Sequence, residues 1–217
     1  MKKITIITPT YNRAKTLPKV FESLLKQSFK DFIWIILDDG STDNTTEVVE
    51  NFQLFNPFFE IIYKKDKNRH KFLTVLEGVK MVKTPYFMVV DSDDIYPEDA
   101  LETLISEVEK IENQDNYVAV MGLSADENGK IVGNQYPNNG FDGSIFEMRY
   151  KHKVRGDKFG IFITKTYQRE ISGKDFSQYE GKGYIPQSVI FNEYDAKGIK
   201  TRFMNKVVRF YLKDDDD

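Results

Sequence analysis

The sequence predicts an α/β protein whose mostly parallel central sheet carries helices on both faces. Two observations predict it. Short apolar, β-branched runs alternate with segments whose apolar residues recur at helical spacing, and the runs are apolar at nearly every position. Strands of that kind are buried on both faces, as in parallel sheets joined by helical crossovers. A chain of 217 residues is long enough for one such domain, which would bury about 70% of its unfolded surface.

The first strand is predicted over residues 3–8, "KITIIT", because β-branched residues dominate it. A helix follows, with Thr16 at its N-cap and Pro18 in its first turn. Its core-facing residues share one face at helical spacing: Leu17, Val20, Phe21, Leu24 and Leu25.

The second buried strand is predicted at 32–37, "FIWIIL", and is followed by the turn "DDGSTDN". Asn44 and Glu47 have the spacing of a capping box, which predicts that a helix begins there. The third strand is predicted at 59–63, "FEIIY".

Two more strand–helix units complete the regular part. The next helix is predicted from one apolar face: Phe72, Val75, Leu76 and Val79. The fourth strand is "YFMVV" (86–90), and after Pro97 a further helix is predicted from Leu101, Leu104, Ile105 and Val108. The fifth strand is "YVAVMG" (117–122).

The second half is less regular. An Asn128-Gly129 pair predicts a hairpin turn, and residues 158–168 and 200–212 read as strands with a loop at 174–187 between them. We expect one domain over 1–217, with a donor-side half (1–115), an acceptor-side half (116–212) and an acidic tail (213–217). The tail, "DDDD", indicates either a domain cut from a longer protein or the remnant of a tag.

Composition excludes several classes of protein. A formal charge of −3 and a pI near 5.6 give no electrostatic case for a nucleic-acid partner. The absence of cysteine excludes disulfides and thiolate metal sites. The start, "MKKITIITPTYNR", lacks the long apolar region of a signal peptide, and no apolar stretch reaches the ~18 residues that span a bilayer. A cytoplasmic protein is expected.

Polar clusters follow three of the predicted strands: "TPTYNR", "DDGSTD" and "DSDD". In an open parallel sheet, ligands bind outside the carboxyl ends of the strands, so these clusters are expected to converge on one site. Each has a plainer reading by itself. Pro9 can simply stop a strand, Tyr11 can pack, and Asp, Gly and Ser are ordinary turn residues. Asp38 and Asp39 together exceed what a turn needs, which favours a ligand role for at least one.

The cluster "DSDD" places three carboxylates in four positions, Asp91, Asp93 and Asp94, where like charges repel. A bound cation would explain them, and an oxygen-only ligand set suits Mg²⁺ or Mn²⁺. The alternatives are a solvated acidic loop or a helix cap, although Pro97 places the helix start a few residues later.

The first 42-residue motif, "ITIITPTYNRAKTLPKVFESLLKQSFKDFIWIILDDGSTDNT", together with "YFMVVDSDDIYPEDALETL", resembles the family-2 glycosyltransferases of GT-A fold. The resemblance implies a UDP-sugar donor and a divalent cation, Mn²⁺ or Mg²⁺, that bridges the donor diphosphate. It also implies a role for each matching position. Pro9 and Tyr11 would flank the uracil base, and Asp39 would accept a hydrogen bond from it. Lys71 would contact the donor, Asp91 and Ser92 of the D-S-D motif would lie by the ribose, and Asp93 would ligate the cation. Where the family often has Gly-Lys, this chain has His70-Lys71, and the role of His70 stays open.

The resemblance implies a metal-dependent, inverting transfer of a hexose from the donor to a hydroxyl of a cell-surface glycan or glycoprotein. The acceptor hydroxyl must lose a proton to a carboxylate. Related sequences have "GEKFxPE" where this chain has Lys182 and Gln187 in place of the two Glu, and Gln cannot take a proton. Either Glu180 or Asp175 substitutes, and we predict Glu180 as the base.

Two other functions fit parts of the sequence. A non-catalytic sugar-nucleotide-binding or oligomerisation module would explain Gln187. An aspartyl-nucleophile phosphatase would use "DSDD", but its signature normally follows the first strand, so it is set aside. His70 and His152 lie too far apart in sequence to support a histidine metal cluster. The aromatic residues Phe203, Phe210 and Tyr211 are read as core or, if exposed, as the contact of a homo-oligomer.

Overall fold

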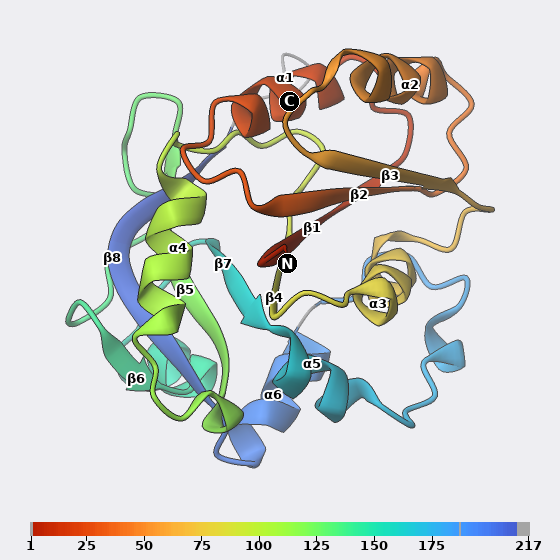
Figure 1. Cartoon of the computed structure of the whole chain (residues 1–217). Coiled ribbons are helices and arrows are strands. Elements are labelled where there is room, and N and C mark those ends of the chain that lie inside the picture. The colour runs from red at the N-terminus through yellow and green to blue at the C-terminus, as the bar shows by residue number, and fades with distance from the viewer. Residues whose placement is uncertain (1, 187, 212–217) are drawn as a thin grey trace.

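The computed structural model describes residues 2–186 and 188–211, which form one eight-stranded sheet with helices on both faces (Figure 1). The strand order is β3-β2-β1-β4-β7-β5-β8-β6. Strands β1 to β4 run parallel, β7 is antiparallel to both of its neighbours, β5 and β8 pair in parallel, and β6 is antiparallel to β8. The predicted fold class, α/β with a mostly parallel sheet, is confirmed.

The strands are β1 (Ile4–Thr10), β2 (Phe32–Asp38), β3 (Glu60–Lys65), β4 (Tyr86–Val89), β5 (Tyr117–Asp126), β6 (Phe141–Gly143), β7 (Lys158–Ile163) and β8 (Lys200–Tyr211). The α-helices are α1 (Leu17–Leu25), α2 (Thr45–Phe55), α3 (Lys71–Met81), α4 (Ala100–Glu109), α5 (Thr164–Ile171) and α6 (Ser188–Ala196). Short turns of other helix types are η1 (Gln114–Asn116), η2 (Glu147–Lys151) and η3 (Ser177–Tyr179).

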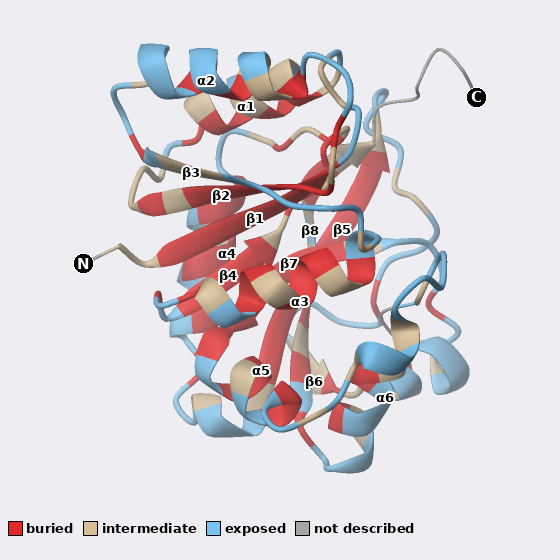
Figure 2. Ribbon diagram, turned by 90° about the vertical axis from the view of Figure 1, so that its right-hand side faces the viewer, coloured by how far each residue is buried: buried red, intermediate tan, exposed pale blue. Residues whose placement is uncertain are grey.

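Two hydrophobic clusters, one on each face, hold the helices on the sheet. Helices α1, α2 and α4 pack on one face, and α3, α5 and α6 pack on the other. Neighbouring residues of one strand serve both clusters, since Ile6 joins the first and Ile7 the second. Figure 2 shows the buried strands between the two helical layers. Burial on both faces explains why the strands are apolar at nearly every position.

The predicted strand over 158–168 is wrong in its second half. β7 ends at Ile163, where its pairing with Tyr86 of β4 ends, and α5 begins at the next residue. Tyr167 and Ile171 lie four residues apart, and both are buried on the face that α5 presents to the sheet. This helical spacing competes with the β-branched residues near the start of α5, and packing on the sheet favours the helix.

The predicted capping box at the start of α2 is also wrong. Asn44 occupies the N-cap position, but its side chain makes no capping hydrogen bond. The side chain of Asp43 instead accepts hydrogen bonds from the backbone N–H and the hydroxyl of Thr45. The helix start is therefore confirmed, while a different residue caps it.

The predictions of a turn at Asn128-Gly129 and of a strand at 200–212 agree with the structure, whereas β6, η2 and α6 were not predicted. Gly129 has φ +79° in a tight turn after β5, and an antiparallel bridge joins Ala125 to Ile131. β8 spans most of the predicted strand at 200–212, with irregular pairing to β5. Phe203 is buried in the core, so it offers no exposed contact for a second subunit. Residue 187 and the predicted tail at 213–217 lie outside the described residues.

Parallel pairing brings the three polar clusters to one edge of the sheet. β1 lies between β2 and β4, and the clusters follow the carboxyl ends of these three neighbouring strands. Within the described ranges, no helix is both long enough and apolar enough to cross a bilayer.

The close approach of β5 and β7 makes a stability prediction. A Cβ atom on Gly160 would lie 2.0 Å from the backbone carbonyl oxygen of Val120, which cannot rotate away. We expect Gly160→Ala to lower the free energy of unfolding by about 2 kcal/mol or more, measured by urea denaturation. Gly183→Ala is the control, because a Cβ atom on Gly183 would have no other atom within 4 Å. Equal stability of the two variants would contradict this account of the strand pair.

Candidate active site

The loops after β1 and β2 are joined through the side chain of Asn12. Its side-chain Oδ1 accepts hydrogen bonds from the backbone N–H groups of Thr42 (2.8 Å) and Asp43 (3.3 Å). The backbone N–H of Asn12 donates to Ser41 Oγ (2.9 Å). Asn12 adopts φ +53°, a left-handed conformation that Asn tolerates better than most residues. These bonds fix "TPTYNR" against "DDGSTD", so the two clusters form one wall.

Asp38 is a structural residue of the turn after β2. Its Oδ1 accepts the backbone N–H of Ser41 (2.7 Å), and its Oδ2 accepts the hydroxyl of Tyr63. Burial, together with the hydrogen bond to Asp38, raises the pKa of Tyr63 to about 12. Both oxygens of Asp38 are therefore occupied by the fold.

Asp39 differs from Asp38, because only one of its oxygens is used. Oδ1 accepts the backbone N–H of Arg69 and the hydroxyl of Thr74, each at 2.8 Å. In the described part of the chain, Oδ2 has no such partner, and Asp39 lines a pocket. Of the two aspartates, Asp39 is the one placed to contact a ligand.

His70 and Lys71 open helix α3 beside this wall. His70 has φ +67° and ψ +149°, in a backbone region that glycine adopts far more readily than other residues. This conformation explains why a glycine suits the position in related sequences. The side chain of His70 is exposed and does not line the pocket, whereas Lys71 does.

The third cluster brings Asp91, Asp93 and Asp94 together, with one carboxylate oxygen of each within 4.8 Å of the others. Each carboxylate has a cationic neighbour. Lys71 Nζ lies 2.6 Å from Asp91, an Arg13 nitrogen lies 3.6 Å from Asp93, and an Arg209 nitrogen lies 3.1 Å from Asp94. The protein itself therefore offsets much of the like-charge repulsion that the sequence alone left unexplained.

The side chains of Asp91 and Asp93 are 30% and 32% exposed, whereas that of Asp94 is 4% exposed and bound to Arg209. Burial and the neighbouring carboxylates raise the pKa of Asp94, and Arg209 opposes the change. Carboxylate oxygens of the two accessible residues fit a hard divalent cation such as Mn²⁺ or Mg²⁺. Asp93 and Asp91 are thus the residues that could hold one, and Asp94 supports their loop.

A pocket of about 270 Å³ lies where the three clusters meet. All seven residues predicted for the donor and the cation line it. The buried hydroxyl of Thr10 also lines it and has no hydrogen-bond partner among the described residues. The full lining is Pro9, Thr10, Tyr11, Arg13, Asp39, Lys71, Asp91, Ser92 and Asp93.

A second cavity of about 800 Å³ adjoins the first, because Lys71 and Asp91 line both. Much of its wall is apolar, from α3, β7 and α6, and Asp157 and Arg209 contribute charged groups. The cavity is large enough for a sugar-sized molecule next to whatever fills the first pocket.

Arg209 is a site residue that the sequence analysis missed. Its side chain is 4% exposed, and its guanidinium donates to Asp94 (3.1 Å), Asp157 (2.7 Å) and Ser124 (3.1 Å). It also lies 4.3 Å from the ring centroid of Tyr211. An arginine within an apolar run was the available signal, but its partners come from three distant segments.

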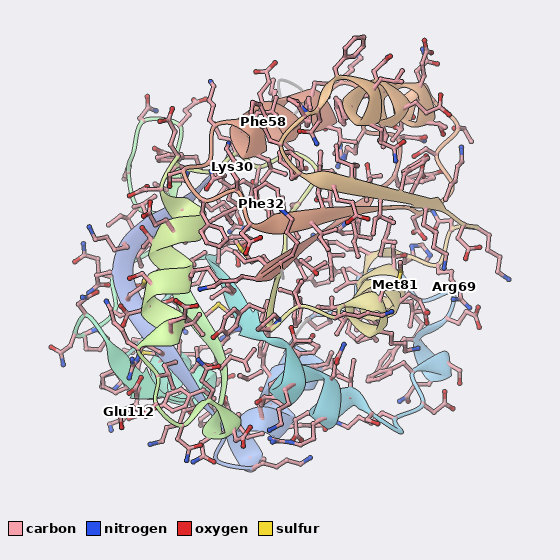
Figure 3. The ribbon with its side chains drawn as sticks, viewed as in Figure 1. Lys30, Phe32, Phe58, Arg69, Met81 and Glu112 are labelled. Atoms are coloured by element: carbon pink, nitrogen blue, oxygen red, sulfur yellow. The ribbon has the colours of Figure 1, made fainter. Side chains whose placement is uncertain are left out.

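Glu180, the predicted base, lies on the loop before α6 and lines neither of these two cavities. Its side chain is 55% exposed, with an Arg69 nitrogen 4.0 Å away. Figure 3 labels Arg69 at the end of α3 that faces this loop. The alternative, Asp175, accepts the backbone N–H and hydroxyl of Ser177, which lower its pKa. Gln187 lies outside the described residues.

Comparison with known proteins gives the same family as the sequence motifs. The family described as "Glycosyl transferase family 2" matches residues 5–175. The chain belongs to this family. The predicted family and the prediction of a transferase domain are confirmed.

One curated relative of this family-2 domain is similar to it over nearly the whole chain. It is 26% identical over 218 residues to the Campylobacter jejuni GalNAc(5)-diNAcBac-PP-undecaprenol beta-1,3-glucosyltransferase, covering 97% of this chain and 65% of that protein. The chain spans 65% or less of the length of the first curated relatives that it matches.

Solved structures share the fold. TarS 1–349 of S. aureus in complex with UDP-GlcNAc matches with a TM-score of 0.71 and 19% identity, over 99% of this chain and 60% of that one. A Pyrobaculum calidifontis mannosyltransferase in complex with GDP-Man and Mn²⁺ matches with a TM-score of 0.69 and 14% identity, over 98% and 57%. Both support the predicted GT-A fold.

The buried ion pair of Arg209 and Asp94 in this family-2 domain leads to a second prediction about stability. We expect Arg209→Met to lower the free energy of unfolding by about 3 kcal/mol, because it leaves buried Asp94 without its cation. The double variant Arg209→Met/Asp94→Asn should recover part of this loss in urea denaturation. Arg149→Met is the control, since Arg149 is exposed and its loss should change the free energy by less than about 0.5 kcal/mol. Equal effects of the two single variants would contradict the structural role of Arg209.

Proposed function

We propose that this domain transfers a hexose from a UDP-sugar to a hydroxyl of a cell-surface glycan or glycoprotein acceptor, with inversion at the anomeric carbon. The observation that carries the proposal is the pocket that gathers all seven predicted donor and cation residues beside a second, larger cavity. Structural neighbours in complex with UDP-GlcNAc and with GDP-Man support a nucleotide-sugar donor.

In this proposal the first pocket holds the nucleotide. Pro9 and Tyr11 flank the uracil ring, and Asp39 accepts its N–H through the oxygen that the fold leaves unused. Asp91 and Ser92 lie by the ribose. Lys71 at the start of α3 contacts the diphosphate, where its charge and the N-terminal end of the helix both favour an anion.

Asp93, with Asp91 beside it, would hold Mn²⁺ or Mg²⁺. When bound, the cation stabilises the negative charge that develops on the leaving diphosphate. Arg13 and Lys71 already neutralise part of the carboxylate charge, and they lie where they can also face diphosphate oxygens. In this proposal the side chains of Arg13 and Lys71 contribute to the affinity for the donor in addition to the cation.

The second cavity holds the acceptor in this proposal, and its hydroxyl needs a carboxylate base. Glu180 stays a prediction for that role. Asp157 is 58% exposed, as much as Glu180, but it is the stronger candidate because it lines the second cavity together with Asp91. Although burial opposes the shift, Arg209 and Tyr211 lower the pKa of Asp157, so it is ionised at neutral pH.

The proposed transfer is a single displacement at the anomeric carbon, and either carboxylate could serve as its base. The acceptor oxygen forms a bond to the anomeric carbon as the bond to the diphosphate oxygen breaks. The electron pair of that bond leaves with the diphosphate, and the acceptor proton passes to the carboxylate. Because the attacking oxygen becomes positively charged as its new bond forms, even a carboxylate of low pKa can take the proton.

Metal-dependent donor binding tests the nucleotide site. We expect Mn²⁺ to tighten UDP binding in isothermal titration, and Asp93→Asn to abolish that gain while the fold is unchanged, because the variant removes a ligand charge. Asp99→Asn is the matched control, since Asp99 is exposed and lies outside the pocket. Undiminished Mn²⁺ dependence in Asp93→Asn would move the cation site elsewhere.

The two candidate bases are separated by paired variants. We expect Asp157→Asn to keep UDP affinity and to lower turnover at least about tenfold, and Glu180→Gln to retain most activity, in assays over a donor and acceptor panel. The reverse result would assign the base to Glu180. Metal-dependent UDP binding by the wild type without any turnover would favour a non-catalytic sugar-nucleotide-binding module.

A further inference from the structure

A run of basic side chains borders the second cavity, although the whole chain has a formal charge of −3. Between residues 147 and 155 the sequence has four basic residues, Arg149, Lys151, Lys153 and Arg155, against one acidic residue, Glu147. All four are exposed, and Arg149 and Arg155 line the cavity. This segment, η2 with residues 152–155, is called the basic rim below.

Internal ion pairs do not account for the charge of the basic rim. Lys151 pairs with Glu147 at 2.7 Å. Across residues 2–186 and 188–211, no carboxylate lies within ion-pair distance of Arg149, Lys153 or Arg155. These three cations serve no ion pair of the described fold, so they are available to an anionic partner.

The basic rim is held firmly on the fold. Met148 and Val154 are 3% and 7% exposed and join the core cluster of α3, α5 and α6. The backbone N–H of Val154 donates to the carbonyl of Met148 (2.9 Å), and that of Arg155 donates to Asn134 Oδ1 (2.7 Å). A buried apolar residue near each end of the turn therefore holds the backbone of the basic rim on the core.

Exposed aromatic rings accompany these cations. Phe146 and Tyr150 are 57% and 60% exposed, and their ring centroids lie 4.4 Å apart. Tyr184, from the loop before α6, is 90% exposed, and all three line the second cavity. Solvated phenyl surface is unfavourable unless a partner covers it, and aromatic rings among basic residues are typical of segments that lie in a membrane interface.

We propose that the basic rim, with Phe146, Tyr150 and Tyr184, docks on the surface of a bilayer that contains anionic lipids. Cations alone would fit any polyanion. The exposed rings favour a bilayer, because they gain free energy by entering the apolar boundary below the headgroups. Docking here would direct the mouth of the second cavity toward the membrane surface, where it would meet acceptors held at a bilayer. The proposal does not rest on the proposed function, since binding needs neither donor nor acceptor.

Vesicle co-sedimentation of the whole chain tests the proposal. We expect the protein to sediment with vesicles of phosphatidylcholine and phosphatidylglycerol, to bind phosphatidylcholine vesicles weakly, and to lose binding as salt is added. Arg149→Glu/Lys153→Glu should weaken partitioning at least about tenfold, because it reverses two unpaired charges of the rim.

A matched control changes the same charge elsewhere. Lys19 and Lys26 are exposed residues of α1 and of its C-cap. Helix α1 and β6, the strand just before the rim, lie at opposite ends of the molecule in Figures 1 and 2. Lys19→Glu/Lys26→Glu should bind like the wild type. Circular dichroism of each variant confirms that the fold is retained.

A second pair of variants tests the rings. Phe146→Ser/Tyr150→Ser should reduce binding several-fold at unchanged charge. Leu54→Ser/Phe55→Ser, which alters an exposed apolar pair on α2, should not reduce it. Equal loss in the control and rim variants, or no sedimentation of the wild type with either vesicle, would overturn the proposal. Binding to soluble polyphosphate without binding to vesicles would overturn it as well and assign the rim to a soluble polyanion.

Discussion

The contact of Arg209 with Asp94 is the interaction on which the arrangement of the site depends. It joins the last strand, β8, to the loop after β4, two segments 115 residues apart. The same guanidinium binds Asp157 in the second cavity, so one buried cation holds both the acidic loop after β4 and the carboxylate of Asp157. A buried charge of this kind persists only when its partners are in place, and the acidic loop after β4 therefore needs the last strand, β8.

The parallel sheet is the second constraint. Because β2, β1 and β4 are adjacent and parallel, whatever follows their carboxyl ends meets at one edge, which is why three short motifs distant in sequence form one pocket. The hydrogen bonds of Asn12 then fix two of these loops against each other.

Electrostatics at this edge is more balanced than the number of aspartates implies. Lys71, Arg13 and Arg209 each lie beside one carboxylate of the acidic cluster, so the charge of the site is shared among side chains before any ligand binds. The second cavity differs, because its wall is largely apolar and its outer border is basic and aromatic. The first pocket therefore offers mainly charged and polar groups, whereas the second offers an apolar wall with a basic border.

The sequence by itself determined the parallel half of the sheet, the helices that cover it and, through the family resemblance of its motifs, seven of the nine residues that line the first pocket. Burial on both faces and strand-end motifs leave local patterns, which is why these features could be predicted. The same sequence predicted a strand where α5 begins and misplaced the cap of α2, because tertiary packing and one neighbouring side chain prevail over local propensity there. Only the tertiary structure showed that both oxygens of Asp38 are used by the fold, gave Asp94 its partner Arg209, placed Asp157 in the second cavity and left Glu180 outside it. Those distinctions depend on contacts between segments far apart in the chain, and no local spacing records which distant residue a side chain will meet.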